Sequence, residues 1–231
     1  MKKIAIVLAV ALMAVSCKFV SYTGDVLPGK NSIVCKGEVK TQILSELTGF
    51  DAVTVNGHAD VAFVQGEQYE VSVKANQEVF DYLNFKVEDG TLVLQSKDKR
   101  TIKAETFDVT VTAPVLKKVL VNGASDFEMK DYTSGENLDV VINGAGDFDL
   151  KRIVTPSLAF TVNGAGDIEA DSIDVDYLGV DVNGAGDVQV SGKAGKARLK
   201  VSGAGDIDVS RLECSDVDTH KSGIASIKLP K

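Results

Sequence analysis

The stretch that decides the fold lies between residues 121 and 206, where one six-residue motif occurs five times. The copies are VNGASD from Val121, INGAGD from Ile142, VNGAGD from Val162, VNGAGD from Val182 and VSGAGD from Val201. A degenerate copy, KSGIAS, begins at Lys221. From each copy to the next, the second residue of the motif recurs after 21, 20, 20, 19 and 20 residues. A period this constant is typical of architectures built by stacking repeats.

The residues around each motif alternate between apolar and polar. Leu138, Val140 and Ile142 precede one copy at every second position, and Phe148 and Leu150 continue the alternation after it. Such alternation places the apolar side chains on one face of a strand. A unit of this length cannot bury its apolar face alone, so the units must stack with equivalent strands paired in parallel. The sequence therefore predicts an all-β domain, a parallel β-helix or β-solenoid with about 20 residues per turn.

We expect this domain to span residues 47–231, with its regular repeats in residues 119–227. Its length corresponds to about nine turns. An earlier motif copy, VNGHAD from Val55, predicts about three turns without the motif between it and the copy that contains Asn122. Lys221 stands in the column of inward apolar residues, so the last turn is expected to be a cap that protects an open sheet edge.

Residues 1–17 have the form of a bacterial export signal, with basic residues ahead of an apolar run too short to span a bilayer. Ala14–Cys17 resembles a lipobox, which predicts lipid attachment at Cys17 and a membrane contact through that anchor. The alternative is a cleaved signal ahead of an unmodified cysteine. Lys18 follows instead of the Asp of an inner-membrane retention signal, so we expect the outer membrane, with periplasmic and surface orientation left open. Residues 18–46 are expected to form a flexible tether.

Cys35 and Cys214 remain if Cys17 carries lipid. In an exported chain, two cysteines that carry no lipid can form a disulfide. The linear stack places these two residues near opposite ends, so two separate thiols are expected instead.

Several pieces of the chain resemble one known family. They are Gly49–Val55, Gln65–Glu67, Val87–Leu92, Thr110–Pro114 and the tandem NGAGD copies. Together they resemble the putative auto-transporter adhesin head GIN domain, a domain of unknown function, over roughly residues 47 to 215. The resemblance implies a single-stranded right-handed β-helix on an exported bacterial protein, and an adhesin role for the family.

Two columns of polar residues recur once per turn and are the candidate site. Stacked amides at a solenoid corner can hydrogen-bond to one another, and outward carboxylates can accept bonds from turn N–H groups. We interpret both columns as a structural turn ladder, with ligand contact by the same groups as the alternative. The residues are Asn122, Asn143, Asn163, Asn183, Ser202, Asp126, Asp147, Asp167, Asp187 and Asp206.

The acidic column raises the question of calcium. The motif superficially resembles a calcium-binding nonapeptide, but that repeat has a period of nine residues. Calcium takes six to eight oxygen ligands, and one carboxylate per turn is a sparse set. We therefore predict no metal and no cofactor.

Charge and composition exclude several function classes. The formal net charge of -8 argues against nucleic-acid binding, which depends on basic groups. His58 and His220 are the two histidines of the chain and are expected far apart, so they cannot share a catalytic triad or a metal site. The sequence therefore predicts a protein that is not an enzyme.

The leading hypothesis is a non-catalytic cell-envelope lipoprotein whose rigid β-helix is an adhesin or a binding or structural module. Its ligand, an unknown protein or glycan, and its oligomeric state are left open. The alternative is a carbohydrate-binding or polysaccharide-processing β-helix protein, because β-helices host polysaccharide lyases. That alternative requires exposed aromatic side chains, for which Tyr132 and Tyr177 are the candidates in the repeats.

Overall fold

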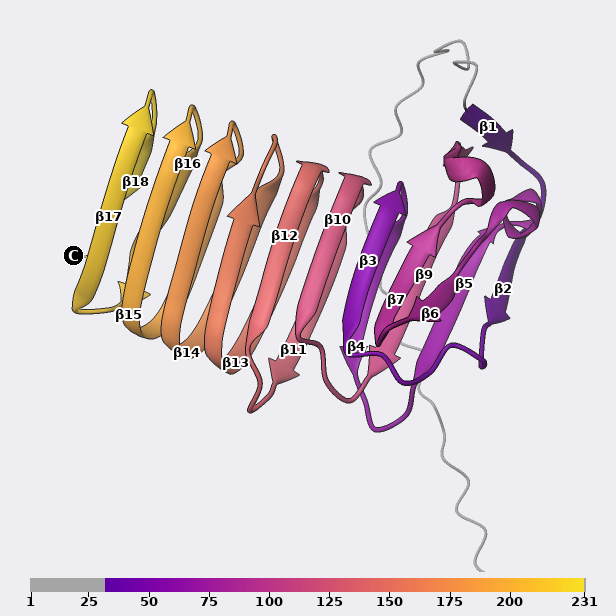
Figure 1. Ribbon diagram of the computed structural model, residues 1–231, viewed down its shortest axis with the longest axis horizontal. Coiled ribbons are helices and arrows are strands. Elements are labelled where there is room, and N and C mark those ends of the chain that lie inside the picture. Colours follow the sequence, from indigo (N-terminus) through magenta and orange to yellow (C-terminus); the bar gives the residue numbers. More distant parts are fainter. Residues whose placement is uncertain (1–31, 231) are drawn as a thin grey trace, which may run out of the picture.

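The structure of the 231-residue chain is a computed structural model that describes residues 32–230. It is 70% strand and 5% helix, arranged as a β-solenoid of about 6 turns with roughly 20 residues per turn. The predicted fold class is confirmed, whereas the prediction of nine turns is wrong. Figure 1 shows the turns side by side along the long axis of the molecule, with the N-terminal strands at one end and the C-terminal strands at the other.

The elements fall into an N-terminal block and a regular solenoid. The block contains β1 (Ser32–Cys35), β2 (Val39–Ile43), β3 (Ala52–Gly57), β4 (Asp60–Gln65), β5 (Glu70–Asn76), the 3-10 helix η1 (Gln77–Tyr82), β6 (Lys86–Glu88), β7 (Thr91–Gln95), the 3-10 helix η2 (Lys97–Lys99), β8 (Thr101–Ala104) and β9 (Phe107–Ala113). The solenoid continues with β10 (Lys118–Ala124), β11 (Phe127–Thr133), β12 (Leu138–Ala145), β13 (Asp147–Val162), β14 (Asp167–Gly184), β15 (Val188–Gly203), β16 (Asp206–Glu213), β17 (Asp216–Gly223) and β18 (Ser226–Lys228).

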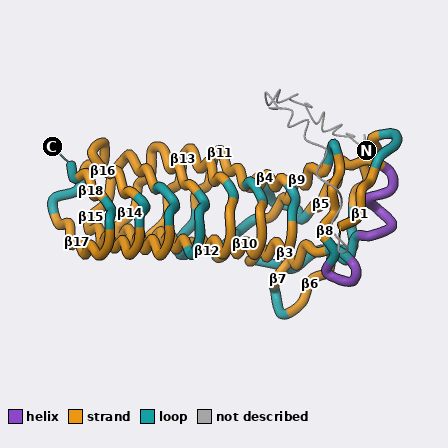
Figure 2. The backbone as a smooth tube through the Cα atoms, turned by 90° about the horizontal axis from the view of Figure 1, so that it is seen from above, coloured by secondary structure: helices purple, strands orange, loops and turns teal. Residues whose placement is uncertain are grey.

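Each solenoid strand pairs in parallel with the equivalent residues of the neighbouring turns. Val140 pairs with Phe160, and Phe160 pairs with Val180. These three side chains are at most 3% exposed, while the next residue, Thr161, is half-buried on the outer face. Because successive side chains of a strand point to opposite faces, the apolar columns meet inside the coil and form one continuous core. Figure 2 shows the coils from above.

The first motif copy lies directly against the second one. β3 pairs with β10, so Asn56 is opposite Asn122, and on its other side β3 pairs with β7. The residues between β4 and β10 leave the stack, form the antiparallel pairs β5 with β9 and β6 with β7, and return on the opposite side of β3. The prediction of three intervening turns is therefore wrong. Spacing along the chain does not report stacking order, because a long excursion costs little more closure entropy than a short one.

Part of the predicted tether belongs to the folded domain. β1 pairs in parallel with β8, and β2 pairs antiparallel with β5. Cys35 at the end of β1 is 1% exposed. The expectation of a flexible segment is therefore wrong for residues 32–46, since these short strands gain their stability from partners far along the chain. Residues 18–31, the export signal at 1–17 and the predicted lipid site at Cys17 lie outside the described residues.

The motif glycines allow the coils to approach each other at the corners. Gly144 has φ +155°, a conformation that L side chains rarely adopt. A Cβ atom at this position would overlap the carbonyl oxygen of Gly123 in the preceding turn. Glycine is therefore required here both by the backbone conformation and by the close contact between turns.

The C-terminal edge of the solenoid carries a charge, and a cysteine lies near each end of the molecule. At the C-terminal end, Lys221 stands in register with the buried Val201, but its side chain is exposed. A charge therefore occupies the inward column at the open edge, which disfavours further strand pairing there. Cys35 near one end and Cys214 near the other are both free thiols, as predicted.

Candidate functional site

The asparagine column forms a continuous chain of side-chain hydrogen bonds. Each amide nitrogen donates to the amide oxygen of the preceding turn: Asn122 Nδ2 to Asn56 Oδ1 at 2.9 Å, Asn143 Nδ2 to Asn122 Oδ1 at 2.9 Å, Asn163 Nδ2 to Asn143 Oδ1 at 2.9 Å and Asn183 Nδ2 to Asn163 Oδ1 at 3.1 Å. We call these residues the amide ladder. Each inner amide uses one of its two N–H donors and one of its two acceptor lone pairs along the ladder, so half of its hydrogen-bonding capacity faces solvent or a ligand.

The amide ladder continues at both ends with other residues. Asn56 Nδ2 donates to Gln95 Oε1 at 3.5 Å on the N-terminal side. On the C-terminal side Ser202 stands opposite Asn183 in the sheet, and Ser222 stands opposite Ser202. Asn56 and Gln95 were not among the predicted ladder residues, because the spacing along the chain suggested three turns between the first motif copy and Asn122.

The predicted aspartates all lie on the outer face. Their side chains are exposed, and four of them accept a backbone bond from the next turn. The accepting pairs are Asp126 Oδ1 from Asp147 N at 3.0 Å, Asp167 Oδ1 from Asp187 N at 2.8 Å, Asp187 Oδ1 from Asp206 N at 2.9 Å and Asp206 Oδ1 from Ser226 N at 2.9 Å. The bonds were expected from the corner of the same turn, so the structure corrects this detail.

Asp147 is the exception in this column. The backbone N–H of Asp167 donates to Gly146 O at 3.1 Å instead of to the carboxylate of Asp147. Burial and the neighbouring carboxylates of Asp126 and Asp167 raise the pKa of Asp147. Asp147 therefore lacks the backbone N–H bond that was expected throughout the column, and its pKa lies above the ordinary value.

The acidic column is longer than the motif pattern predicted. Asp60 is opposite Asp108 in the sheet, and the adjacent Val61 is opposite Phe127, which places Asp60 beside Asp126. We call the resulting row the aspartate stripe: Asp108, Asp60, Asp126, Asp147, Asp167, Asp187 and Asp206. The final Asp of VNGHAD was a signal for Asp60, whereas nothing in the sequence pattern pointed to Asp108.

Charge within the stripe is offset in part by neighbouring groups. Burial, Asp126 and Asp108 raise the pKa of Asp60, and His58 opposes this shift. Lys74 lies 3.5 Å from Asp108 at the N-terminal end of the stripe. The stripe therefore carries repulsion that its hydrogen bonds do not remove.

Other acids on the outer face pair with lysines. Lys151 Nζ lies 2.7 Å from Asp149 and 3.5 Å from Asp171. Lys228 Nζ lies 3.0 Å from Asp208. These exposed pairs contribute little stability individually.

Among these paired acids, Asp208 has the strongest partners. Its Oδ1 accepts from Ser210 Oγ at 2.6 Å and from Ser210 N at 3.0 Å. Together with Lys228, these bonds lower the pKa of Asp208 to about 2. Its carboxylate is therefore held ionised over the whole physiological pH range.

Features expected of an enzyme do not come together in the described part of the chain. No group of three or more His, Cys, Asp or Glu side chains there could hold a metal ion. His58 lies in the corner after β3 and donates to Ala124 O, while His220 lies on β17 at the opposite end. A hollow beside His58 and Arg100 has a volume of about 20 Å³, enough for about one water molecule. Among residues 32–230, no helix has the length and apolarity to span a bilayer.

Comparison with known families finds one that covers most of the chain. A family model described as "Putative auto-transporter adhesin, head GIN domain" matches residues 49–230. The chain belongs to this family. The resemblance inferred from the motifs is thereby confirmed, and a non-enzymatic role is consistent with the head GIN description.

Solved structures share the fold at low sequence identity. A putative lipid binding protein from Parabacteroides distasonis ATCC 8503 is 20% identical with a TM-score of 0.73, over 86% of this chain and 99% of that chain. A putative adhesin from Bacteroides fragilis NCTC 9343 is 18% identical with a TM-score of 0.67, over 85% and 99%. No curated protein matches. At these identities the likeness establishes the head GIN fold alone.

Proposed function

We propose that this protein is a non-catalytic cell-envelope lipoprotein that presents the aspartate stripe for binding at the cell envelope, as an adhesin-type module. The observation that carries the proposal is the continuity of the amide ladder and the aspartate stripe over successive turns. A surface repeated at the strand spacing of about 4.8 Å suits an extended polymer or another protein better than a compact substrate.

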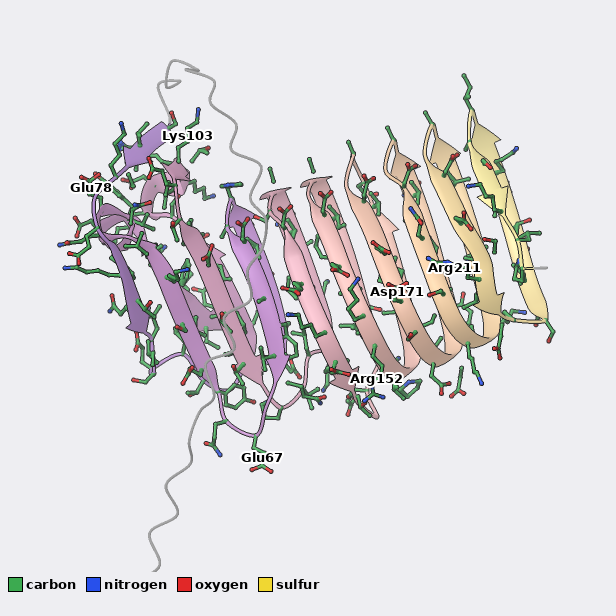
Figure 3. All side chains as sticks on the ribbon, turned by 180° about the vertical axis from the view of Figure 1, so that it is seen from behind. Glu67, Glu78, Lys103, Arg152, Asp171 and Arg211 are labelled. Atoms are coloured by element: carbon green, nitrogen blue, oxygen red, sulfur yellow. The ribbon has the colours of Figure 1, made fainter. Side chains whose placement is uncertain are left out.

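The shape of the molecule supports binding rather than catalysis. The regular turns are joined by short corners, which leaves no long loops to wall a cleft (Figure 3). An enzyme site needs a concave, largely apolar pocket with convergent polar groups. The family description agrees with this proposal at the level of an adhesin-like envelope protein.

The lipid anchor is tested by exchanging the predicted attachment residue. Cys17→Ser should move the protein from the detergent phase to the aqueous phase during phase extraction, while its thermal melt stays unchanged. Lys18→Ala is the matched control and should partition like wild type. Equal partitioning of Cys17→Ser and wild type would refute the anchor.

The binding role is tested with arrays of glycans and extracellular-matrix proteins. A triple variant, Asp147→Asn, Asp167→Asn and Asp187→Asn, should weaken wild-type binding at least tenfold. The control exchanges three acids outside the stripe, Asp131→Asn, Asp174→Asn and Asp176→Asn, and should bind like wild type. Equal loss in both triple variants would show a general charge effect and refute the assignment of the stripe.

Carbohydrate binding remains a second candidate because of one observation at Tyr177. Its ring lies over Gly179 on the outer face, and a Cβ built on Gly179 would meet Tyr177 Cε1 at 3.4 Å. Tyr177 is partly exposed, and an exposed aromatic ring is a surface on which a sugar ring can stack. Tyr132, the other candidate, is 0% exposed and donates to Leu116 O at 2.6 Å, so it cannot contact a glycan. Tyr177→Ala should abolish binding to any glycan hit, whereas Tyr82→Ala should leave it unchanged; the reverse result would refute this candidate.

A further inference from the structure

β2 (Val39–Ile43) lies at one edge of the large sheet. Within the described residues it pairs with β5 alone and ends one side of the large sheet. All five of its side chains are exposed, and the exposed fractions of Val39 and Ile43 are 42% and 56%. An adjacent hollow of about 360 Å³ is lined by Lys40, Thr41, Gln42, Gln77, Phe80 and Asp81. An open edge with exposed β-branched residues is a template for pairing with another strand.

The hydrogen bonds to β5 show which backbone groups point to the open edge. Leu44 N donates to Val71 O, and Gln77 N donates to Glu38 O. In an antiparallel ladder the residues that bond to one neighbour occur at every second position. The even-numbered residues of β2 therefore bond to β5. The N–H and C=O groups of the odd-numbered residues, Val39, Thr41 and Ile43, face the open edge.

We infer that two copies of this chain pair through β2 as an antiparallel, twofold-symmetric dimer centred on Thr41. The sequence of the strand, VKTQI, is close to a palindrome in its side-chain character. With Thr41 opposite Thr41 of the second copy, Val39 falls opposite Ile43 and Lys40 falls opposite Gln42. The three odd-numbered residues of each copy then exchange six N–H···O=C bonds, because all of them are hydrogen-bonded pairs.

The side chains fit this pairing on both faces. One face brings together Val39 with Ile43 twice and Thr41 with Thr41, which are favourable cross-strand pairs. The other face sets the single charge, Lys40, against neutral Gln42, so no like charges meet. The pairing is isologous, since the same patch is used by both copies.

The opposite end of the molecule lacks this complementarity. β17 is the corresponding edge there, and its exposed residues include Asp216, Asp218, His220 and Lys221. Charged edge strands resist pairing. The dimer therefore joins two molecules at their N-terminal ends, where β2 lies (Figure 1). A contact of one short strand is small, so we expect a concentration-dependent dimer.

Charge exchange at Thr41 tests the pairing. Sedimentation velocity of the full chain in one detergent, over a hundredfold range of concentration, should show a monomer–dimer equilibrium for wild type. Thr41→Lys and Thr41→Glu should each weaken dimerisation at least tenfold, because like charges would then face each other at the twofold axis. A mixture of the two variants should recover a heterodimer. Thr219→Lys on β17 is the matched control and should dimerise like wild type.

The result is independent of the anchor and of the stripe. Thermal melts of both Thr41 variants should match wild type, because the Thr41 side chain is exposed and its backbone does not bond to β5. A wild-type protein that is monomeric at every concentration would overturn the inference. The open edge of β2 would then be covered by another part of the chain or bound by a different partner. A mixture of Thr41→Lys and Thr41→Glu that fails to associate would overturn it as well.

Discussion

The aspartate stripe sets a residue-scale problem of repulsion between like charges. Carboxylates about 4.8 Å apart repel by about 0.9 kcal/mol in water and by about 3.5 kcal/mol at an effective dielectric constant of 20. Backbone N–H groups of the next turn offset this cost at Asp126, Asp167, Asp187 and Asp206. Asp147 lacks such a bond, so its charge is less compensated than the charges of these four.

At Asp147 we predict that removing the charge stabilises the protein. Its pKa is raised in the folded state, so the folded state holds the proton more tightly than the unfolded chain does. Its contribution to stability is present at low pH and is lost as the pH rises through the raised pKa. Asp147→Asn should therefore raise the melting temperature at pH 7, and the gain should shrink as the pH falls toward the ordinary value of 3.8.

Asp208→Asn is the control with the opposite sign. The pKa of Asp208 is lowered to about 2, so the stability it contributes is present above 3.8 and is lost as the pH falls toward 2. This variant should melt lower than wild type at pH 7. Melts of both variants between pH 3 and pH 8 decide the matter, and a destabilised Asp147→Asn at pH 7 would contradict the account of the stripe.

For Asp167 we predict a structural role that needs no calcium. Asp167→Asn keeps the oxygen that accepts from Asp187 N, so its effect on unfolding should stay within about 0.5 kcal/mol. Asp167→Ala loses the acceptor and should cost about 1 kcal/mol or more. Melting temperatures should not differ between excess calcium and chelator for any of the three proteins. A calcium-dependent rise of several degrees in wild type would point to a metal site instead.

At the scale of the element, the solenoid strand divides its side chains between the core and solvent. Phe160 is 1% exposed between Val140 and Val180, whereas Thr161 lies on the outer face. Phe160→Ala should lower the free energy of unfolding by about 3 to 5 kcal/mol, because it leaves a cavity. Thr161→Ala should cost less than about 1 kcal/mol. Similar denaturant midpoints for the two variants would show that the assigned face is wrong.

At the scale of the whole molecule, the two thiols lie near opposite ends of the stack and are expected to differ in reactivity. Cys35 is 1% exposed, and burial, Glu78 and Asp81 raise the pKa of its thiol. Cys214 is partly exposed. Alkylation of the native protein should therefore label Cys214 quickly, and Cys35 should react only after denaturation. Peptide mapping without reductant checks both points, and a Cys35–Cys214 cross-linked peptide would be incompatible with the fold.

The sequence by itself determined the coil and its two polar columns. A period near twenty with alternating apolar residues leaves a stacked β-solenoid as the way to bury Phe160 and its equivalents, and this argument depends on local spacing alone. The same spacing placed Asn122, Asn143, Asn163 and Asn183 in one row.

Only the tertiary structure decided which strands far apart in the sequence become neighbours in the sheet. Asn56 meets Asn122, Asp108 joins the aspartate stripe, and β2 becomes an edge, because the chain between β4 and β10 leaves the stack and returns on the other side of β3. Nothing in the periodicity encodes this order. Pairing with distant strands, such as β1 with β8, stabilises segments whose own sequence is too short and irregular to predict a strand.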